Sequence, residues 1–144
     1  MIHHAGLIAQ RVGGVWRGIL IEGPSGAGKS DLALRAMAHG FQLVADDRVL
    51  LWATGGRLYG RAPDMLAGQI EVRGHGIMTA PARPFCEVCL LIRAGEADRI
   101  PDPATQTMLG VVIPLLKVAP LEESAPIKLG LALTAFDATH KRRI

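Results

Sequence analysis

The feature that most constrains this chain is the segment Gly-Pro-Ser-Gly-Ala-Gly-Lys-Ser at residues 23–30, which matches the pattern G-x-x-x-x-G-K-[S/T]. An apolar run at residues 18–21 precedes it, and apolar residues recur at helical spacing over residues 30–39. This strand–loop–helix context distinguishes a phosphate-binding loop from a chance glycine-rich turn. The sequence therefore predicts an α/β fold that binds a nucleotide.

Each residue type in this segment has a chemical reason. Glycines allow main-chain N–H groups to surround phosphate oxygens without steric clash. A lysine would place a cation beside the β- and γ-phosphates, and the following serine would offer its hydroxyl to Mg²⁺. The N-terminus of the next helix adds positive partial charge. The residues predicted to bind the nucleotide are Gly23, Pro24, Ser25, Gly26, Ala27, Gly28, Lys29 and Ser30.

Two adjacent carboxylates, Asp46 and Asp47, follow the short apolar run at residues 41–45. A carboxylate at the end of the strand after the loop helix can hold the nucleotide's metal ion. Because neighbours on an extended segment point different ways, one could bind Mg²⁺ while the other accepts a proton from an attacking hydroxyl. The alternative is an Asp-rich turn capped by Arg48.

A third cluster lies at residues 71–76, where Glu71 and Arg73 are two positions apart and would share one face of a strand. A carboxylate that assists a metal, beside a guanidinium group, suits phosphoryl transfer. An ordinary surface ion pair is an equally good interpretation of the same two residues.

The net charge of +3 comes from the C-terminus, because three of the 16 basic residues lie within the last four positions. The other 13 basic residues balance 13 acidic ones, so the body lacks the basic excess that nucleic-acid binding needs. No apolar run approaches the roughly 18 to 20 residues of a membrane span. We predict one domain over residues 1–136 and a basic tail over residues 137–144, with no nucleic-acid or membrane partner.

The two cysteines, Cys86 and Cys89, form a C-x-x-C within an apolar segment that resembles a buried strand. Residues three apart on a strand face opposite sides, so the two sulfurs could not share a metal ion. We expect buried, reduced thiols, which is typical of a cytoplasmic protein.

Periodicity and turn residues predict several short strands and two helices, and so a mixed sheet rather than a regular doubly wound one. Pro114 would sit at an edge or bulge, because proline lacks a backbone donor. A polar, proline-containing surface loop is expected over residues 94–107. The expected strands are residues 6–12, 15–21, 41–45, 49–53, 57–60, 69–72, 84–92 and 111–118, and the expected helices are residues 30–39 and 126–136.

Three segments together resemble the catalytic domain of HPr kinase/phosphorylase. They are the loop at residues 23–30, Leu-Val-Ala-Asp-Asp-Arg-Val at residues 43–49, and Ile-Glu-Val-Arg-Gly-His-Gly-Ile at residues 70–77. The resemblance implies a fold like the core of phosphoenolpyruvate carboxykinase and a hexameric assembly. It also implies an ATP- and Mg²⁺-dependent kinase that phosphorylates a serine of HPr, the phosphocarrier of the bacterial sugar phosphotransferase system.

The resemblance also assigns roles to individual residues. Asp47 would be the base that activates the target serine, and Lys29 would bind the phosphates. Arg73 would lie beside the metal site, His4 matches the family's early catalytic histidine, and Arg99 matches its catalytic arginine. The metal ligands would be Ser30, Asp46 and Glu71.

Compared with the family, we expect a minimal form without the N-terminal domain and with the C-terminal helical region shortened to about residues 125–136. Residues 113–120 stand in place of the segment tied to the reverse, phosphate-dependent reaction. We therefore expect a kinase without phosphorylase activity that regulates a phosphotransferase system. Two alternatives are a P-loop kinase for a small metabolite and a non-catalytic, ATP-binding regulatory module.

Overall fold

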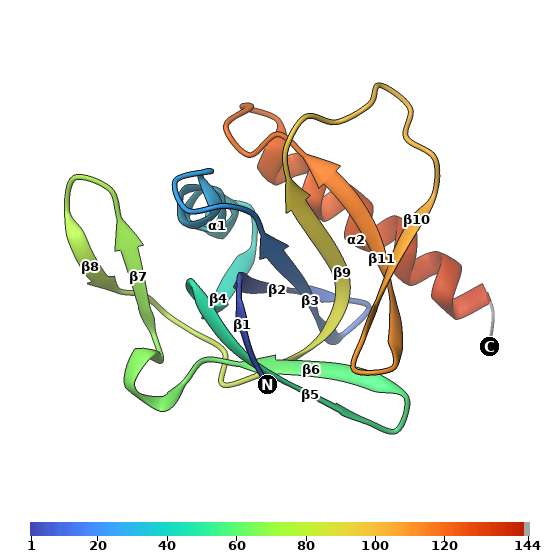
Figure 1. Ribbon diagram of the computed structural model, residues 1–144, viewed down its shortest axis with the longest axis horizontal. Helices are drawn as coiled ribbons and strands as arrows, with labels where there is room; N and C mark the ends of the chain where they lie inside the picture. The colour runs from blue at the N-terminus through green and yellow to red at the C-terminus, as the bar shows by residue number, and fades with distance from the viewer. Residues whose placement is uncertain (143–144) are drawn as a thin grey trace.

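The computed structural model describes the backbone of residues 1–142 and the side chains of residues 1–136 (Figure 1). Within this part of the chain, a curled nine-stranded sheet has the order β1-β5-β6-β9-β3-β2-β4, and β11 and then β10 branch from β9. A separate hairpin, β7–β8, projects to one side of it (Figure 1). The elements are β1 Ile2–His4, β2 Gly6–Val12, β3 Val15–Glu22, α1 Lys29–Met37, β4 Phe41–Ala45, β5 Arg48–Thr54, β6 Arg57–Arg61, the short 3₁₀ turn Asp64–Leu66, β7 Gln69–Val72, β8 Gly76–Thr79, β9 Cys86–Ala94, β10 Ala104–Met108, β11 Val111–Val118 and α2 Ala125–Arg142.

The sheet is mixed, as the sequence predicted. Strand β9 runs parallel to β3 on one side and to β11 on the other, whereas the hairpins β2–β3, β5–β6 and β10–β11 are antiparallel. Pro114 pairs with Thr105 of β10, just before β11 begins to pair with β9 at Leu115. At Pro114 one side of β11 is not yet paired with β9, so the strand does not need the N–H that proline lacks. This is the edge position that the sequence predicted.

Two hydrophobic cores lie on the two faces of the sheet. Both helices cover one face, where Ile19 and Ile92 pack with Leu32 of α1 and Leu129 of α2. The other face lies inside the curl, where a second buried cluster includes Leu91. Because alternate strand residues face opposite sides, the same strands supply both cores, among them β2, β3, β4, β9 and β11.

The two cysteines belong to different cores, which confirms the predicted opposite orientation. Cys86 is buried in the core inside the curl, and Cys89 packs against the core under the helices; both are free thiols. Burial raises the pKa of Cys86 far above its usual range and raises the pKa of Cys89 to about 11.

Several predictions about the elements are corrected by the structure. The loop expected over residues 94–107 ends in strand β10, whose polar Ala-Thr-Gln-Thr sequence is exposed and therefore carries no apolar alternation. Gly74 lies within the turn of the β7–β8 hairpin and Gly76 begins β8, and the fully exposed β8 had no apolar–polar pattern to detect. The three-residue strand β1 was not predicted at all.

Helix α2 is longer than the predicted helix over residues 126–136, because its backbone continues to Arg142. It therefore crosses the predicted domain boundary at residue 136, while the side chains of the predicted basic tail, residues 137–144, lie outside the described residues. Neither α1 nor the described part of α2 has the combined length and apolar character that crossing a membrane requires.

Candidate active site

The glycine-rich loop, residues 23–28, connects the end of β3 to the start of α1. Gly26 and Gly28 have φ angles of 81° and 96°, in the left-handed region that glycine adopts without a Cβ clash. The ammonium group of Lys29 lies within the loop, because its Nζ donates to the carbonyl oxygens of Gly23 at 2.5 Å and Pro24 at 3.3 Å. The loop therefore holds one cation at the positive end of a helix, which is a favourable arrangement for an anion.

The chain after β11 lies directly against this loop. A Cβ built on Gly28 would be 2.9 Å from Cδ2 of Leu121. Arg35 of α1 holds this connection by donating to the main-chain oxygens of Pro120 and Glu122. Gly28 is therefore constrained both by its backbone angle and by its neighbour.

Asp46 joins two of the elements around the loop. The hydroxyl of Ser30 donates to Asp46 Oδ1 at 2.7 Å, and the main-chain N–H of Glu71 donates to Asp46 Oδ2 at 2.9 Å. Two of the three predicted metal ligands, Ser30 and Asp46, are thus in direct contact. Glu71 reaches the same carboxylate only through its backbone, and its side chain is exposed.

A hydroxyl and a carboxylate are hard oxygen donors, which suit Mg²⁺. Among the described residues, no group of three or more His, Cys, Asp or Glu side chains could enclose a metal ion. Mg²⁺ beside a nucleotide is usually bound through one or two protein oxygens, with phosphate oxygens and water completing the shell. The pair Ser30–Asp46 therefore fits the metal that the sequence predicted.

Asp47 lies in a tight turn between β4 and β5. Its φ is 66°, an angle that few residues other than glycine adopt but that aspartate tolerates. The Arg48 N–H donates to the Asp46 carbonyl oxygen at 2.7 Å, and the Ala5 N–H donates to the Asp47 carbonyl oxygen at 3.1 Å. These two bonds fix the backbone at Asp47 and leave its side chain exposed.

The other predicted site residues are exposed and lie on three different segments. Arg73 lies in the turn of the β7–β8 hairpin and is exposed, and no ion pair joins it to Glu71 among the described residues. Arg99 is exposed in the segment between β9 and β10. His4 is exposed on β1, directly opposite Arg48 of β5.

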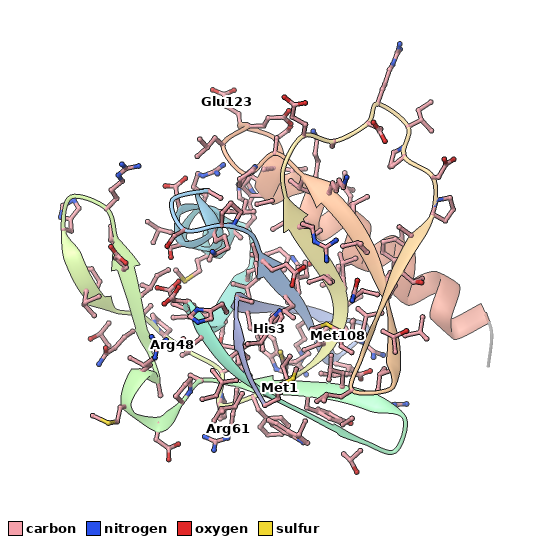
Figure 2. All side chains as sticks on the ribbon, in the orientation of Figure 1. Met1, His3, Arg48, Arg61, Met108 and Glu123 are labelled. Carbon is pink, nitrogen blue, oxygen red and sulfur yellow. The ribbon has the colours of Figure 1, made fainter. Side chains whose placement is uncertain are left out.

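Three residues that sequence reasoning missed meet beside the loop. His3 Nε2 lies 2.9 Å from Glu22 Oε2, and Arg93 donates to Glu22 Oε1 from Nε at 2.8 Å and Nη2 at 2.6 Å. Figure 2 labels His3 on β1 and Arg48 at the start of the neighbouring β5. The signal available in the sequence was a glutamate directly before the first glycine of the motif, at the end of the apolar run at residues 18–21.

These residues line an open cleft beside the loop, bounded by residues 2–4 of β1, Glu22, Gly23, Pro24, Arg93 and Ala94. Partial burial of Glu22 acts to raise its pKa, but the hydrogen bonds from His3 and Arg93 and their positive charge outweigh burial, so the pKa is lowered. The carboxylate is therefore ionised at neutral pH and holds both partners in place.

Comparison with protein families gives a match over residues 3–83 to the HPr serine kinase C-terminal domain. The match spans the glycine-rich loop, both adjacent aspartates and the β7–β8 hairpin, but not Arg99. The HPr kinase/phosphorylase of Limosilactobacillus reuteri (strain DSM 20016) is 34% identical over an alignment 145 positions long, and this alignment covers 85% of this chain and 45% of that protein. The HPr kinase/phosphorylase of Clostridium tetani is 48% identical over 65 residues, which cover 45% of this chain and 21% of that protein.

Among solved structures, the Hpr(Ser) kinase/phosphatase from Coxiella burnetii superimposes with a TM-score of 0.77 at 24% sequence identity. That comparison covers 99% of this chain and 97% of the other, so the two chains share the whole fold. The chain spans less than half the length of the curated relatives that it matches.

Proposed function

The chain belongs to the family of HPr serine kinase C-terminal domains, and on that premise we propose that it transfers the γ-phosphate of ATP to a serine of an HPr-like phosphocarrier protein. One observation carries the proposal. The Ser30 hydroxyl and the Asp46 carboxylate are in contact at the start of α1, and Asp47, with an exposed carboxylate, is the next residue. Metal ligands and a base for the acceptor hydroxyl are thus supplied by adjacent groups.

The glycine-rich loop would bind the phosphates of ATP. Main-chain N–H groups at the start of α1 and the ammonium of Lys29 supply positive charge to phosphate oxygens, which lowers the barrier to transfer by electrostatic stabilisation. Ser30 and Asp46 would hold Mg²⁺, which neutralises phosphate charge when bound.

Asp47 would act on the acceptor serine. Its carboxylate takes the proton of the hydroxyl as the serine oxygen forms a bond to the γ-phosphorus and the bond between that phosphorus and the bridging oxygen of ADP breaks. The left-handed turn supports this role, because it fixes the backbone and leaves the carboxylate exposed to a protein substrate. The cleft between β1 and the first residues of the loop is open, which would give a protein acceptor access to this side of the site.

Further parts of the proposal follow from the family. We expect the protein to work in the cytoplasm, to assemble as a hexamer, and to share its core architecture with phosphoenolpyruvate carboxykinase. The reaction proposed is the kinase direction, in regulation of a phosphotransferase system. His4, Arg73 and Arg99 remain predicted contributors, each on a segment that is exposed in this chain.

The test is to incubate the protein with Mg-ATP and HPr from the same source, and to measure the intact mass of HPr. We expect one added phosphate, located on a serine, and no addition with the Lys29→Ala variant. This variant removes the loop's cation but leaves the cores untouched, so it should fold normally.

Other outcomes would identify the alternatives. ATP hydrolysis or transfer without a protein acceptor would favour a kinase for a small metabolite. ATP binding with no turnover would favour a regulatory module. Normal transfer by Lys29→Ala would show that the glycine-rich loop is not the phosphate site.

A further inference from the structure

Strands β3 and β9 carry a charged pair at each end of their parallel ladder. Arg17 is paired in register with Glu87 at the start of the strands, and Glu22 is paired with Arg93 at the end. The two glutamates are equally buried, each with 17% of its side chain exposed. At the end of the strands, Glu22 also binds His3 of β1, which links this pair to the edge of the sheet.

Glu22 divides its two carboxylate oxygens between different parts of the fold. Oε1 accepts both hydrogen bonds from Arg93, on the neighbouring strand β9. Oε2 contacts His3, on β1, which lies at the far end of the curled sheet. In the described residues β1 pairs in the sheet only with β5, so Glu22 connects this edge strand directly to the strand that leads into the glycine-rich loop.

The loop itself begins at the next residue. A Cβ on Gly23 would lie 2.8 Å from the Cβ of Ala94, the neighbour of Arg93, so this first glycine is closely packed against β9. On the other side of the contact, β1 ends at His4, and the next residue, Ala5, donates its N–H to the Asp47 carbonyl oxygen at 3.1 Å. One side of Glu22 thus leads to the phosphate-binding loop and the other leads to the turn that holds Asp47.

We propose that Glu22 is a positioning residue that sets the placement of the Asp47 turn relative to the glycine-rich loop, acting through His3 and β1. The inference rests on the proposed function, in which Asp47 receives a proton from a hydroxyl attacking a phosphate bound in the loop. Glu22 is not required to contact ATP or the acceptor. Its carboxylate is ionised and already satisfied by two partners, which suits it to holding geometry rather than to exchanging protons.

The chain offers a matched control in Glu87. This residue bonds to Arg17 at 3.2 Å and lies 3.6 Å from Arg57, at the opposite end of the same strands. Glu22→Gln and Glu87→Gln each remove one negative charge from an equally buried, arginine-paired site. Loss of stability should therefore be similar, and only the effect on the active site should differ.

Kinetics with an HPr acceptor provide the first measurement. We expect Glu22→Gln to lower kcat by roughly 10- to 100-fold, the range expected when a catalytic group is displaced by about 1 Å. The KM for ATP should change less than about twofold, because the loop residues are unaltered. Glu87→Gln should leave kcat and KM unchanged. His3→Ala should reproduce the effect of Glu22→Gln, and the double variant should be no worse than either single variant, because both remove the same connection.

Hydrogen exchange at the Ala5 amide, followed by NMR, tests the connection without any acceptor. We expect exchange to be at least about tenfold faster in Glu22→Gln and in His3→Ala than in the unaltered protein, and unchanged in Glu87→Gln. If the unaltered protein does not phosphorylate HPr, the proposed function fails, and this measurement still decides whether Glu22 holds the turn. If Glu22→Gln does not fold, His3→Ala provides the same test.

Two results would overturn the inference. One is an Ala5 amide whose exchange rate is the same in the unaltered protein and in the Glu22 and His3 variants. The other is an equal loss of kcat in Glu22→Gln and Glu87→Gln, which would indicate a general effect of losing a buried charge.

Discussion

Replacing Asp46 or Asp47 by asparagine should produce different defects, one mainly in stability and Mg-ATP binding and the other in phosphate transfer. Asp46 accepts hydrogen bonds on both oxygens, from Ser30 and from the Glu71 N–H, whereas Asp47 has an exposed carboxylate in a backbone turn. The substitution keeps side-chain size at both positions and removes one negative charge. The two variants therefore compare a carboxylate that organises the site with one that is free to act on a substrate.

The magnitude for Asp46→Asn follows from its two bonds. A hydrogen bond to a charged group contributes about 1.5–3 kcal/mol, and a neutral one about 0.5–1.5 kcal/mol. Losing the charge from two such bonds should lower the free energy of unfolding by about 2 kcal/mol. Asp47→Asn should change it by less than about 0.5 kcal/mol, because the side chain is exposed and asparagine also tolerates a left-handed backbone.

Asp46→Asn should lose more stability, but Asp47→Asn should lose more of the phosphate-transfer activity. Asp47→Asn should bind Mg-ATP normally and lose about 10²- to 10⁴-fold in kcat, the usual contribution of a general base. Asp46→Asn should weaken the binding of Mg-ATP, because it alters the carboxylate that faces Ser30. Urea denaturation gives the free energies, and calorimetric titration with Mg-ATP and intact-mass measurement of HPr give binding and transfer. Equal destabilisation of both variants, or undiminished transfer by Asp47→Asn, would refute the separate roles.

Three further predictions concern the fold. Gly18→Ala should destabilise the protein by about 1–3 kcal/mol or prevent folding, because its Cβ would lie 2.5 Å from the Glu87 carbonyl oxygen, and urea denaturation measures this. Cys89 should react slowly with iodoacetamide at pH 8 until the protein is unfolded, because a pKa of about 11 leaves roughly one thiol in a thousand ionised. Since the pKa of Glu22 is lowered by folding, its ionised form stabilises the protein at neutral pH, and this contribution is lost as the pH falls below about 4. Between about pH 3 and 7 the free energy of unfolding of Glu22→Gln should therefore change less with pH than that of the unaltered protein, and urea denaturation at several pH values will measure this.

The parts of the fold that could be predicted are those with strong local patterns. Apolar runs bounded by glycine pairs identified β2, β3 and the β5–β6 hairpin, and helical spacing identified α1. The missed strands β1, β8 and β10 are short or exposed, so burial leaves no alternation in their sequences. Their position depends on partners distant in the chain, such as the pairing of His3 with Val49, and a local pattern contains no information about such pairing.

In the candidate site, too, the features with a local sequence pattern were predicted and those that depend on distant partners were not. The motif identified the glycine-rich loop, and its spacing to Asp46 correctly anticipated that Ser30 and Asp46 would meet. The sequence did not indicate that Glu71 would donate its backbone N–H to Asp46, and the metal-ligand role of its carboxylate stays a prediction. The role of His4 came from the family resemblance and stays a prediction, and nothing in the sequence indicated that its neighbour His3 would contact Glu22.

The orientation of β1 explains why this distinction matters for the chemistry. Alternate residues of a strand face opposite sides, so His3 faces Glu22 while its neighbour His4 lies exposed beside Arg48. Ala5, the next residue, places its N–H on the Asp47 carbonyl oxygen. A strand of three residues thus joins an ion pair at the base of the phosphate loop to the turn that presents the proposed base. If Asp47→Asn is inactive but stable, transfer depends on the Asp47 carboxylate and therefore on where this turn holds it. In our proposal the ionised side chain of Glu22 sets that position through His3 and β1.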